Sequence, residues 1–255
     1  MDLNLSGKHA LVCGGSEGIG RAAAIELAAL GADVTLLARR DDALRDAVAA
    51  LPARATQRHG HLVADVSQAT ALADAVAALI AKKPVHILVN NTGGPPGGPA
   101  HAAAIDAYLD AFNKHLVANH TLLQAVLPGM RGARWGRIVN VISIPNLGVS
   151  NTIRGAVASW AKTLSRELGG DGITVNNVLP GYTRTQRLDQ ILADRSTATG
   201  KSRDDIANAM LASVPVGRFA EAGEIGGVIA FLCTDAAAYV NGQSLAVDGG
   251  RMQSI

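Results

Sequence analysis

Short apolar runs alternate with longer alanine- and leucine-rich segments along the chain, and this alternation constrains the fold more than any other feature. Strand-like and helix-like segments in alternation predict a parallel sheet with helices on both faces. We therefore expect one α/β domain over residues 1–255, built on a doubly wound parallel sheet. The predicted strands are residues 10–13, 33–38, 61–64, 85–90, 137–142, 173–179 and 244–247.

The segments between these strands predict helices, with one region left irregular. Ser67 is expected to cap the third helix, and Pro128 with Gly129 to end the fourth. The polar residues 183–214 predict an irregular segment that closes over a substrate pocket, with one helix over residues 203–211. The other helices are expected over residues 21–30, 41–51, 67–82, 103–127, 150–169 and 221–233.

Composition excludes several classes of protein. The 255 residues carry a formal net charge of +2 and only 3% aromatic residues, so binding to nucleic acid or to an anionic membrane surface is not expected. No apolar run is long enough to span a bilayer, and no signal-peptide pattern opens the chain. Cys13 and Cys233 lie in apolar runs without metal-type spacing, which predicts buried free thiols, no metal site and a reducing, cytoplasmic location.

The first predicted strand runs into a glycine-rich turn and then directly into a helix. Gly14, Gly18 and Gly20 together permit the turn, let the backbone approach a phosphate and let the helix pack against the strand. Backbone N–H groups at the helix start, together with the helix dipole, favour an anion above the turn. Glycine turns after strands are common, so this stretch by itself predicts either a phosphate site or an ordinary tight connection.

A doubly wound parallel sheet of this kind is of Rossmann type, and its ligand lies beyond the carboxyl ends of the strands. Glycines and polar residues follow several of the predicted strand ends, so we expect them to share one edge of the sheet. These candidates are residues 14–20, Arg39, Asp65, residues 90–93, Ser143 and residues 180–185.

Four motifs follow in order: Asn-Asn-Thr-Gly at residues 90–93, Gly-Arg-Ile-Val-Asn at 136–140, Ile-Thr-Val-Asn-Asn-Val-Leu-Pro-Gly at 173–181, and Val-Asp-Gly-Gly at 247–250. With the Gly-x-x-x-Gly-x-Gly spacing of residues 14–20, they resemble the short-chain dehydrogenase/reductase family over nearly the whole chain. The Gly-Gly-Pro-Pro loop at residues 93–96 resembles a subgroup similar to β-ketoacyl reductases that departs from the usual catalytic pattern.

The resemblance implies a nicotinamide cofactor, and the end of the second strand bears on which one. Relatives selective for NAD have an acidic residue there, whereas this chain has Arg39 and Arg40 and no carboxylate before Asp41. A guanidinium suits a 2′-phosphate, so NADP(H) is expected and NAD(H) stays the alternative. Glu17 opposes this expectation because a carboxylate near a phosphate is unfavourable. The alternative interpretation is that Arg39 and Arg40 are only solvated surface charges beside Asp41 and Asp42.

The resemblance also implies which residues contact the cofactor. Asp65 and Val66 match the pair that flanks the adenine, although a strand end before a helix cap explains them equally. Thr183 and Thr185 match hydroxyls near the nicotinamide and the pyrophosphate. The cofactor-binding candidates are Gly14, Ser16, Glu17, Gly18, Ile19, Gly20, Arg39, Arg40, Asp65, Val66, Asn91, Thr92, Gly93, Pro180, Gly181, Thr183 and Thr185.

The catalytic positions depart from the family pattern. Relatives use a tyrosine as general acid/base and a lysine four residues later, and these positions align with Ser150 and Arg154. Ser143 matches the serine that polarises the carbonyl, and His115 aligns with an asparagine. A serine hydroxyl is a much weaker acid than a tyrosine, so His115, with a pKa expected near the working pH, is a candidate to supply the proton through Ser143 or Ser150 and water. Alternatively, Ser150 is a helix N-cap and His115 a helix residue at a subunit contact.

Three functions stay open at this point. The first is NADP(H)-dependent reduction of a small-molecule carbonyl or acyl thioester, with Ser-x-x-x-Arg in place of Tyr-x-x-x-Lys. The second is a cofactor-binding sensor or assembly subunit without turnover, which the missing tyrosine favours. The third is a non-redox enzyme on the same fold. The resemblance implies a homotetramer or homodimer formed through the helices near residues 103–127 and 150–168.

Overall fold

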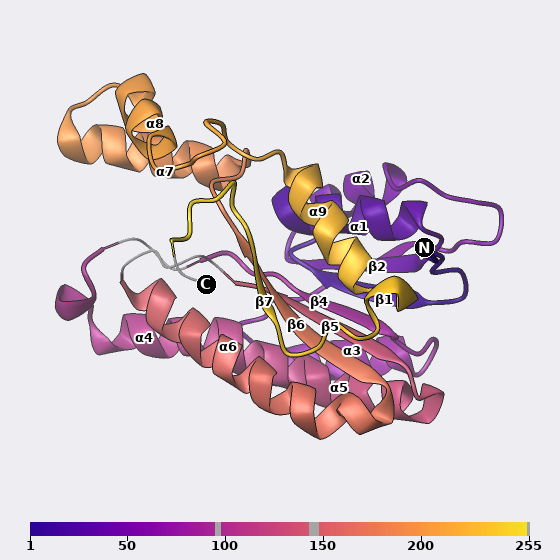
Figure 1. Cartoon of the computed structure of the whole chain (residues 1–255). Coiled ribbons are helices and arrows are strands. Elements are labelled where there is room, and N and C mark those ends of the chain that lie inside the picture. Colours follow the sequence, from indigo (N-terminus) through magenta and orange to yellow (C-terminus); the bar gives the residue numbers. More distant parts are fainter. Residues whose placement is uncertain (95–97, 143–147, 254–255) are drawn as a thin grey trace.

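The computed structural model describes residues 1–94, 98–142 and 148–253, and these contain one seven-stranded parallel sheet (Figure 1). The strand order β3-β2-β1-β4-β5-β6-β7 places β1 and β4 side by side near the middle, so the chain winds outward in both directions. This order confirms the predicted doubly wound fold of Rossmann type. The strands are β1 (His9–Cys13), β2 (Asp33–Ala38), β3 (Gly60–Val63), β4 (Ile87–Asn90), β5 (Gly136–Val141), β6 (Ile173–Pro180) and β7 (Ser244–Val247).

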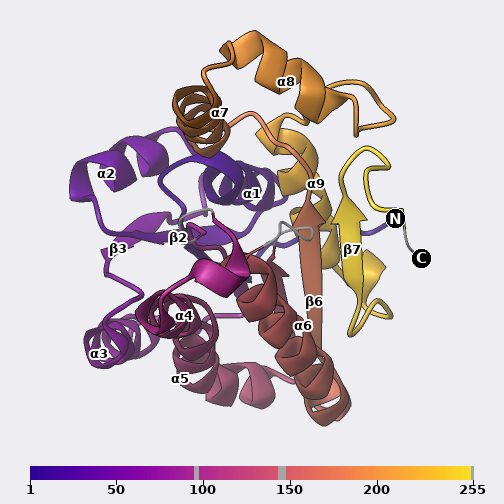
Figure 2. The same ribbon diagram turned by 90° about the vertical axis from the view of Figure 1, so that its left-hand side faces the viewer.

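Helices cover both faces of the sheet, which is why its central strands are buried on both sides and mostly apolar (Figure 2). One core cluster joins the sheet to α1, α2 and α9, and a second joins it to α3, α5 and α6. Every residue of β1 and β5 is buried, and each fully buried leucine around them stabilises the fold by roughly 2 kcal/mol. The helices are α1 (Gly18–Ala29), α2 (Asp41–Ala49), α3 (Ala69–Ile80), α4 (Ile105–Phe112), α5 (Ala118–Ala133), α6 (Val149–Leu168), α7 (Gln186–Thr199), α8 (Arg203–Leu211) and α9 (Ala222–Leu232).

The helix expected over residues 103–127 differs from the prediction at both its middle and its end. It consists of α4, a π-helical turn η2 (Asn113–Val117) and α5, which continues past Pro128 to Ala133. The predicted end at Pro128 and Gly129 is therefore wrong. A proline removes a single backbone donor, and buried Val126 and Met130 hold the helix on the core to either side of it.

The predicted cap of the third helix is also wrong. Helix α3 begins at Ala69 with Gln68 at the N-cap position. The hydroxyl and backbone N–H of Ser67 instead donate to Asp65 Oδ1, at 2.8 and 2.9 Å. An aspartate side chain that accepts a hydrogen bond from the backbone two residues later forms a compact turn. Ser67 belongs to this turn, so it is not the N-cap residue of α3.

Residues 183–214 are more ordered than the sequence predicts. They hold two helices, α7 and α8, of which only α8 was expected (Figures 1 and 2). The two helices share a small apolar cluster of Leu188, Ile206, Met210 and Phe219, separate from the clusters that hold the sheet. Thr185 caps α7 by accepting a hydrogen bond from Leu188 N. In Figure 1 the pair stands beyond one edge of the sheet, which fits a cover over a ligand site.

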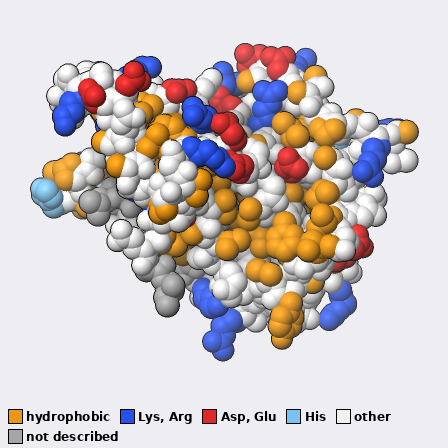
Figure 3. All heavy atoms as spheres, turned by 45° about the horizontal axis from the view of Figure 1, so that its top comes forward, with side chains coloured by type: hydrophobic (Ala, Val, Ile, Leu, Met, Phe, Trp, Pro, Cys, Tyr) orange, Lys and Arg blue, Asp and Glu red, His pale blue; other side chains and the backbone are white. Residues whose placement is uncertain are grey.

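The surface and the thiols agree with the composition. Basic and acidic side chains are interspersed on the face in Figure 3, as the formal net charge of +2 suggests. Cys13 and Cys233 are free and fully buried as predicted, and burial raises the pKa of each thiol to about 12. Within the described ranges, no helix is long and apolar enough to cross a membrane. No group of three or more potential metal ligands occurs in that same part of the chain.

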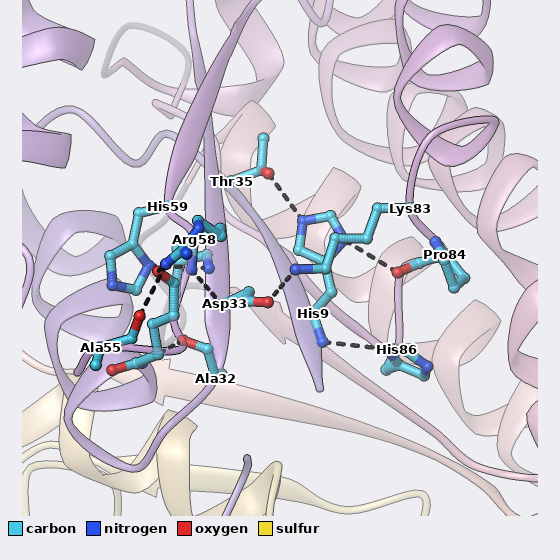
Figure 4. A network of polar contacts seen from close by, with 12 residues as sticks. His9, Ala32, Asp33, Thr35, Ala55, Arg58, His59, Lys83, Pro84 and His86 are labelled. Carbon is cyan, nitrogen blue, oxygen red and sulfur yellow. Dashed lines mark hydrogen bonds and ion pairs between the residues drawn. The ribbon is translucent and has the colours of Figure 1, made fainter. Parts of the chain in front are cut away.

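A polar network ties the amino ends of β1 and β2 to the segment before β4 (Figure 4). The ring of His9 contacts the Pro84 carbonyl oxygen through Nδ1 at 3.0 Å and the Thr35 hydroxyl through Nε2 at 2.8 Å. Lys83 forms an ion pair with Asp33 beside it. Burial lowers the pKa of His9 to about 4, so the ring is neutral at pH 7. The network lies at the edge of the sheet opposite the strand carboxyl ends and serves the fold.

Candidate active site

The glycine turn after β1 has the geometry that close backbone contact requires. Gly14 and Gly18 have positive φ angles of 59° and 57°, a region that favours glycine. A Cβ atom on Gly14 would lie 2.7 Å from the carbonyl oxygen of Asn91, and one on Gly20 would lie 2.2 Å from the carbonyl oxygen of Gly14. Glu17, the N-cap residue of α1, makes no side-chain capping bond. The first backbone N–H groups of α1 therefore remain available for an anion.

A cleft of about 400 Å³ follows the ends of β2 and β3. Arg39 and Asp65 stand on its wall, so the structure brings these two candidates together. Hydrogen bonds from the backbone and hydroxyl of Ser67 lower the pKa of Asp65, which keeps the carboxylate charged. Val66 packs against the core cluster under the cleft. The cleft is lined by Arg39, Val63, Ala64, Asp65, Gln68 and Ala71.

Glu17 and Arg40 form an exposed ion pair, with Oε2 and Nη2 3.1 Å apart. Asp41 is engaged elsewhere, by Arg45 at 2.8 Å and His61 at 2.8 Å. The carboxylate of Glu17 is thus matched by a neighbouring cation, which reduces its repulsion of a nearby phosphate. Arg39 lines the cleft, and its positive charge acts on the carboxylate of Asp65.

Ser150 and Arg154 lie one helical turn apart near the start of α6. Arg154 donates from Nε to Ser150 Oγ at 3.2 Å and from Nη1 to the Val141 carbonyl oxygen at 2.9 Å. A Cβ atom on Gly94 would lie 3.5 Å from Arg154 Nη2, so the loop after β4 passes directly over the guanidinium. Helix α6 begins at Val149 with Gly148 as its N-cap, so the alternative that Ser150 caps the helix is wrong.

His115 lies in the π-helical turn η2 and is only 4% exposed. Its Nδ1 is 2.6 Å from the hydroxyl oxygen of Thr92, which follows β4. Burial, and secondly the positive charge of Arg154, lower the pKa of His115 to about 4. The expectation of a pKa near the working pH is therefore wrong, because the ring is out of water and beside a cation. The hydrogen-bond partner of His115 lies in the same chain, so its burial needs no subunit contact.

The segment after β6 reaches the glycine turn. Gly181 packs so closely on Asp248 that a Cβ atom would lie 2.7 Å from that residue's Cα. The Thr183 hydroxyl donates to the Gly181 carbonyl oxygen at 3.1 Å. A Cβ atom on Gly18 would lie 3.3 Å from Thr185 Cγ2, so the start of α7 sits above the turn. Ser143 lies outside the described residues.

Sequence reasoning missed two features of this edge. The first is a ladder of buried amides: Asn90 donates to Asn140 at 2.8 Å, and Asn140 donates to Asn177 at 2.9 Å. It ties three adjacent strands together directly beneath the site. The second is Arg187 in the first turn of α7, whose charge acts on Arg154. Thr185 as a capping residue and Asp189 in the first turn were the available signals for that helix.

The fold and this edge define a class: a doubly wound parallel sheet of Rossmann type with a glycine-rich turn and polar residues at its strand ends. A family model described as enoyl-(acyl carrier protein) reductase matches residues 14–251. The 3-oxoacyl-[acyl-carrier-protein] reductase FabG of Pseudomonas aeruginosa is 35% identical over 263 residues, which cover 99% of this chain and 100% of that protein.

Solved structures agree with these sequence matches. The L-sorbose reductase of Gluconobacter frateurii, complexed with NADPH and L-sorbose, has a TM-score of 0.92 at 28% identity over 100% of both chains. YwfH, an NADPH-dependent reductase involved in bacilysin biosynthesis, has a TM-score of 0.90 at 25% identity, over 98% of this chain and 100% of its own. The chain belongs to the short-chain dehydrogenase/reductase family and resembles its 3-oxoacyl-reductase subgroup.

Proposed function

We propose that the protein is an NADP(H)-dependent oxidoreductase that interconverts a small-molecule carbonyl and the corresponding alcohol. The observation that carries this proposal is the joint geometry of the glycine turn and the cleft at Arg39. The turn offers free N–H groups where a side chain would clash, and the cleft offers a guanidinium for a 2′-phosphate. NADPH or NADP is bound in several of the similar solved structures, which agrees with this choice. NAD(H) is the weaker alternative.

The residues present fit the cofactor along its whole length. The N–H groups at Gly14, Ser16, Gly18, Ile19 and Gly20 would hold the pyrophosphate. Arg39 would hold the 2′-phosphate, with Arg40 available if Glu17 releases it, and Asp65 and Val66 would flank the adenine. Residues nearer the reacting end would be Asn91, Thr92, Gly93, Pro180, Gly181, Thr183 and Thr185. When bound, the cofactor supplies a hydride to the carbonyl carbon, and the carbonyl oxygen takes up a proton.

Ser150 and Arg154 would act at the carbonyl oxygen. Because Arg154 Nε donates to Ser150 Oγ, the hydroxyl proton of Ser150 is free to point at a substrate oxygen. Arg154 stays charged at pH 7, so it stabilises the negative charge that develops on that oxygen during reduction. Ser143 is proposed as a second donor to the same oxygen. Ser150 and Arg154 would therefore stabilise the developing charge. Ser150 is a poor source of the proton, because an aliphatic hydroxyl is a weak acid.

The proton therefore comes from solvent through a relay. His115 is neutral and bonded to Thr92, so it can pass a proton between its ring nitrogens but is not a reservoir. We propose that it connects water to the hydroxyls at Ser143 or Ser150. If His115→Ala leaves the rate of reduction unchanged, this relay is wrong.

We also propose that the chain forms a homodimer or homotetramer through α4 with α5, and through α6. Three apolar side chains of α4 at helical spacing are exposed in the single chain: Ile105 by 73%, Leu109 by 56% and Phe112 by 39%. A second copy would cover this stripe. The buried free thiols support work in a reducing cytoplasm.

The decisive experiment titrates NADPH and NADH into the protein and then follows NADPH oxidation with a panel of ketones and ketoacyl thioesters. We expect tight NADPH binding, and turnover with at least one class of carbonyl. Tight binding without turnover would favour a sensor or assembly subunit, and binding with a redox-neutral product would favour a non-redox enzyme. Absence of binding to either coenzyme would overturn the proposal.

A further inference from the structure

The loop that follows β4, residues 91–94, connects two parts of the candidate site. At its start, Asn91 donates from Nδ2 to the Cys13 carbonyl oxygen at 3.4 Å, which holds the loop against the glycine turn. Further on, a Cβ atom on Gly94 would lie 3.5 Å from Arg154 Nη2, so the loop has reached the start of α6. Thr92 therefore lies between the proposed cofactor turn and the residues proposed as catalytic.

The side chain of Thr92 bonds to His115. Its Oγ1 lies 2.6 Å from Nδ1 of His115, whose ring is buried in the π-helical turn η2. This turn packs against α6, the helix that carries Ser150 and Arg154. Since the ring engages the hydroxyl of Thr92, the backbone of Thr92 is the part left to contact a cofactor. One side-chain hydrogen bond thus joins the loop to the π-helical turn.

The direction of this hydrogen bond follows from the donors and acceptors available. Burial lowers the pKa of His115 to about 4, so at pH 7 the ring is neutral and only one of its nitrogens carries a proton. Among the described residues, Oγ1 of Thr92 has no second hydrogen-bond partner, and Nε2 of His115 has none. A proton on Nδ1 would leave both the hydroxyl proton of Thr92 and the lone pair of Nε2 unpaired. A hydroxyl that donates to Nδ1 leaves only the N–H group at Nε2, so this arrangement is favoured.

We infer that Thr92 is a positioning residue for the reduction: its hydroxyl donates to Nδ1 of His115 and holds the ring with its proton on Nε2. The same bond fixes the rotation of the ring about its χ2 torsion, which is otherwise broad. This inference rests on the proposed function and deepens it, because it says which ring nitrogen donates in the relay and which one accepts.

The relay then moves a proton without charging the ring. Nε2 gives its proton to the hydroxyl of Ser143 or Ser150, directly or through water, as that hydroxyl gives its own to the substrate oxygen. At the same time Nδ1 takes the hydroxyl proton of Thr92, and Thr92 recovers one from water. One proton has moved from solvent to the alcohol, and no electrons are transferred in these steps. Exchange with water afterwards returns the ring proton to Nε2.

The first test identifies the protonated nitrogen directly. Nitrogen NMR of protein that contains isotopically labelled histidine distinguishes a ring N–H group from an acceptor nitrogen, and His115→Gln identifies the His115 signals by their loss. At about pH 7.5 we expect the proton on Nε2. His9 is an internal reference with the opposite pattern, because its Nδ1 faces the Pro84 carbonyl oxygen and must donate (Figure 4). A proton on Nδ1 of His115 would overturn the inference.

Variants of Thr92 test its role in the reaction. Thr92→Val keeps the shape of the side chain but removes the hydroxyl, so the Nδ1 signal of His115 should move to that of an unbonded nitrogen. We expect kcat for reduction to fall roughly 10-fold, with KM for the carbonyl compound within about twofold of wild type. The ratio of kcat in light water to kcat in heavy water should rise, because proton delivery becomes slower. Thr92→Ser restores the hydroxyl and should recover most of kcat, and equal losses in the two variants would refute the role of the hydroxyl.

Thr35→Val is the matched control. Thr35 lies 2.8 Å from Nε2 of His9 through its hydroxyl oxygen, so the chain holds a second pair of threonine and histidine at the opposite edge of the sheet (Figure 4). This variant should change the signals of His9 alone and leave kcat unchanged. A fall in kcat as large as that of Thr92→Val would contradict a specific role for Thr92.

The two kinds of measurement separate this inference from the proposed function. If no carbonyl compound is reduced while His115 carries its proton on Nε2 and responds to Thr92→Val, the proposed function fails and the positioning of the ring stands. If a carbonyl compound is reduced and Thr92→Val leaves kcat unchanged, the positioning role is wrong and the proposed function stands.

Discussion

Replacement of Arg39 by glutamine tests the cofactor assignment most selectively. Arg39 is exposed at the mouth of the cleft, so its hydrogen bonds to a 2′-phosphate would be partly screened by solvent. We take the lower end of the range for a charge-assisted bond, about 1.5 kcal/mol, which corresponds to about a 10-fold rise in Kd for NADPH. NADH lacks the phosphate, so its Kd should change by less than about twofold.

The assay is a fluorescence titration of each reduced coenzyme into wild-type and variant protein. Arg45→Gln is the matched control, because Arg45 is exposed and pairs with Asp41 on α2. Glu17→Gln should act in the opposite direction, since it frees Arg40 from its ion pair and lowers Kd for NADPH by a few-fold. Equal losses of NADPH and NADH affinity in Arg39→Gln would refute the reasoning, because they would place Arg39 away from the 2′-phosphate.

Three further predictions concern stability and geometry. Gly20→Ala should lower the free energy of unfolding by about 2 kcal/mol or more and abolish NADPH binding, because its Cβ would lie 2.2 Å from the Gly14 carbonyl oxygen. Gly132→Ala in α5 meets no atom within 4 Å and should be neutral or stabilising, so equal behaviour of the two variants would contradict the packing argument. Asn140→Ala should cost about 2–4 kcal/mol in urea unfolding because it leaves two buried amides without their partners, and a cost under about 1 kcal/mol would disprove the ladder's contribution. Finally, His115 has a folded-state pKa of about 4 against an ordinary 6.5, so its contribution to stability is full above pH 6.5 and is lost as pH falls toward 4. Between pH 7.5 and 5 this loss is about 2 kcal/mol, and His115→Gln should lose correspondingly less over that interval than wild type.

The sheet and its functional edge were predictable because strand ends carry local signals. One apolar run ends before Gly14 and another before Asn91, and neither residue type is typical of a buried strand interior. Because neighbouring parallel strands have their carboxyl ends at the same end of the sheet, these two residues were expected to lie together. The structure accordingly brings the glycine turn against Asn91, and Arg39 against Asp65. No knowledge of tertiary contacts was required for that step.

Features that depend on contacts between distant segments were not predictable. Helix α7 was not predicted because its apolar side chains pack on a distant part of the chain: Leu188 lies in one cluster with Phe219, 31 positions later. Pro128 reads as a helix end in sequence, yet packing on the sheet carries α5 through it. Burial of His115 depends on the π-helical turn and on Thr92, and without those the ring would titrate near its ordinary pKa of 6.5.

The same limit applies to the residues proposed as catalytic. The spacing of Ser150 and Arg154 placed them on one helical turn, and in the structure a hydrogen bond joins their side chains. That spacing could not show that Arg154 would be partly buried and bonded to the Val141 carbonyl oxygen, or that the charge of Arg187 would act on it. Charge balance at a site depends on which elements pack over it, and α7 is the element that the sequence left undefined.

The central claim is that hydride transfer occurs at a site where serine and arginine replace tyrosine and lysine. The most direct test supplies NADPH deuterated at the transferred position, together with each carbonyl compound of the substrate panel, and analyses the product by mass spectrometry. The account predicts an alcohol with one deuterium on the carbinol carbon, formed in proportion to the coenzyme oxidised. Tight NADPH binding with no deuterated alcohol from any carbonyl compound offered would contradict it.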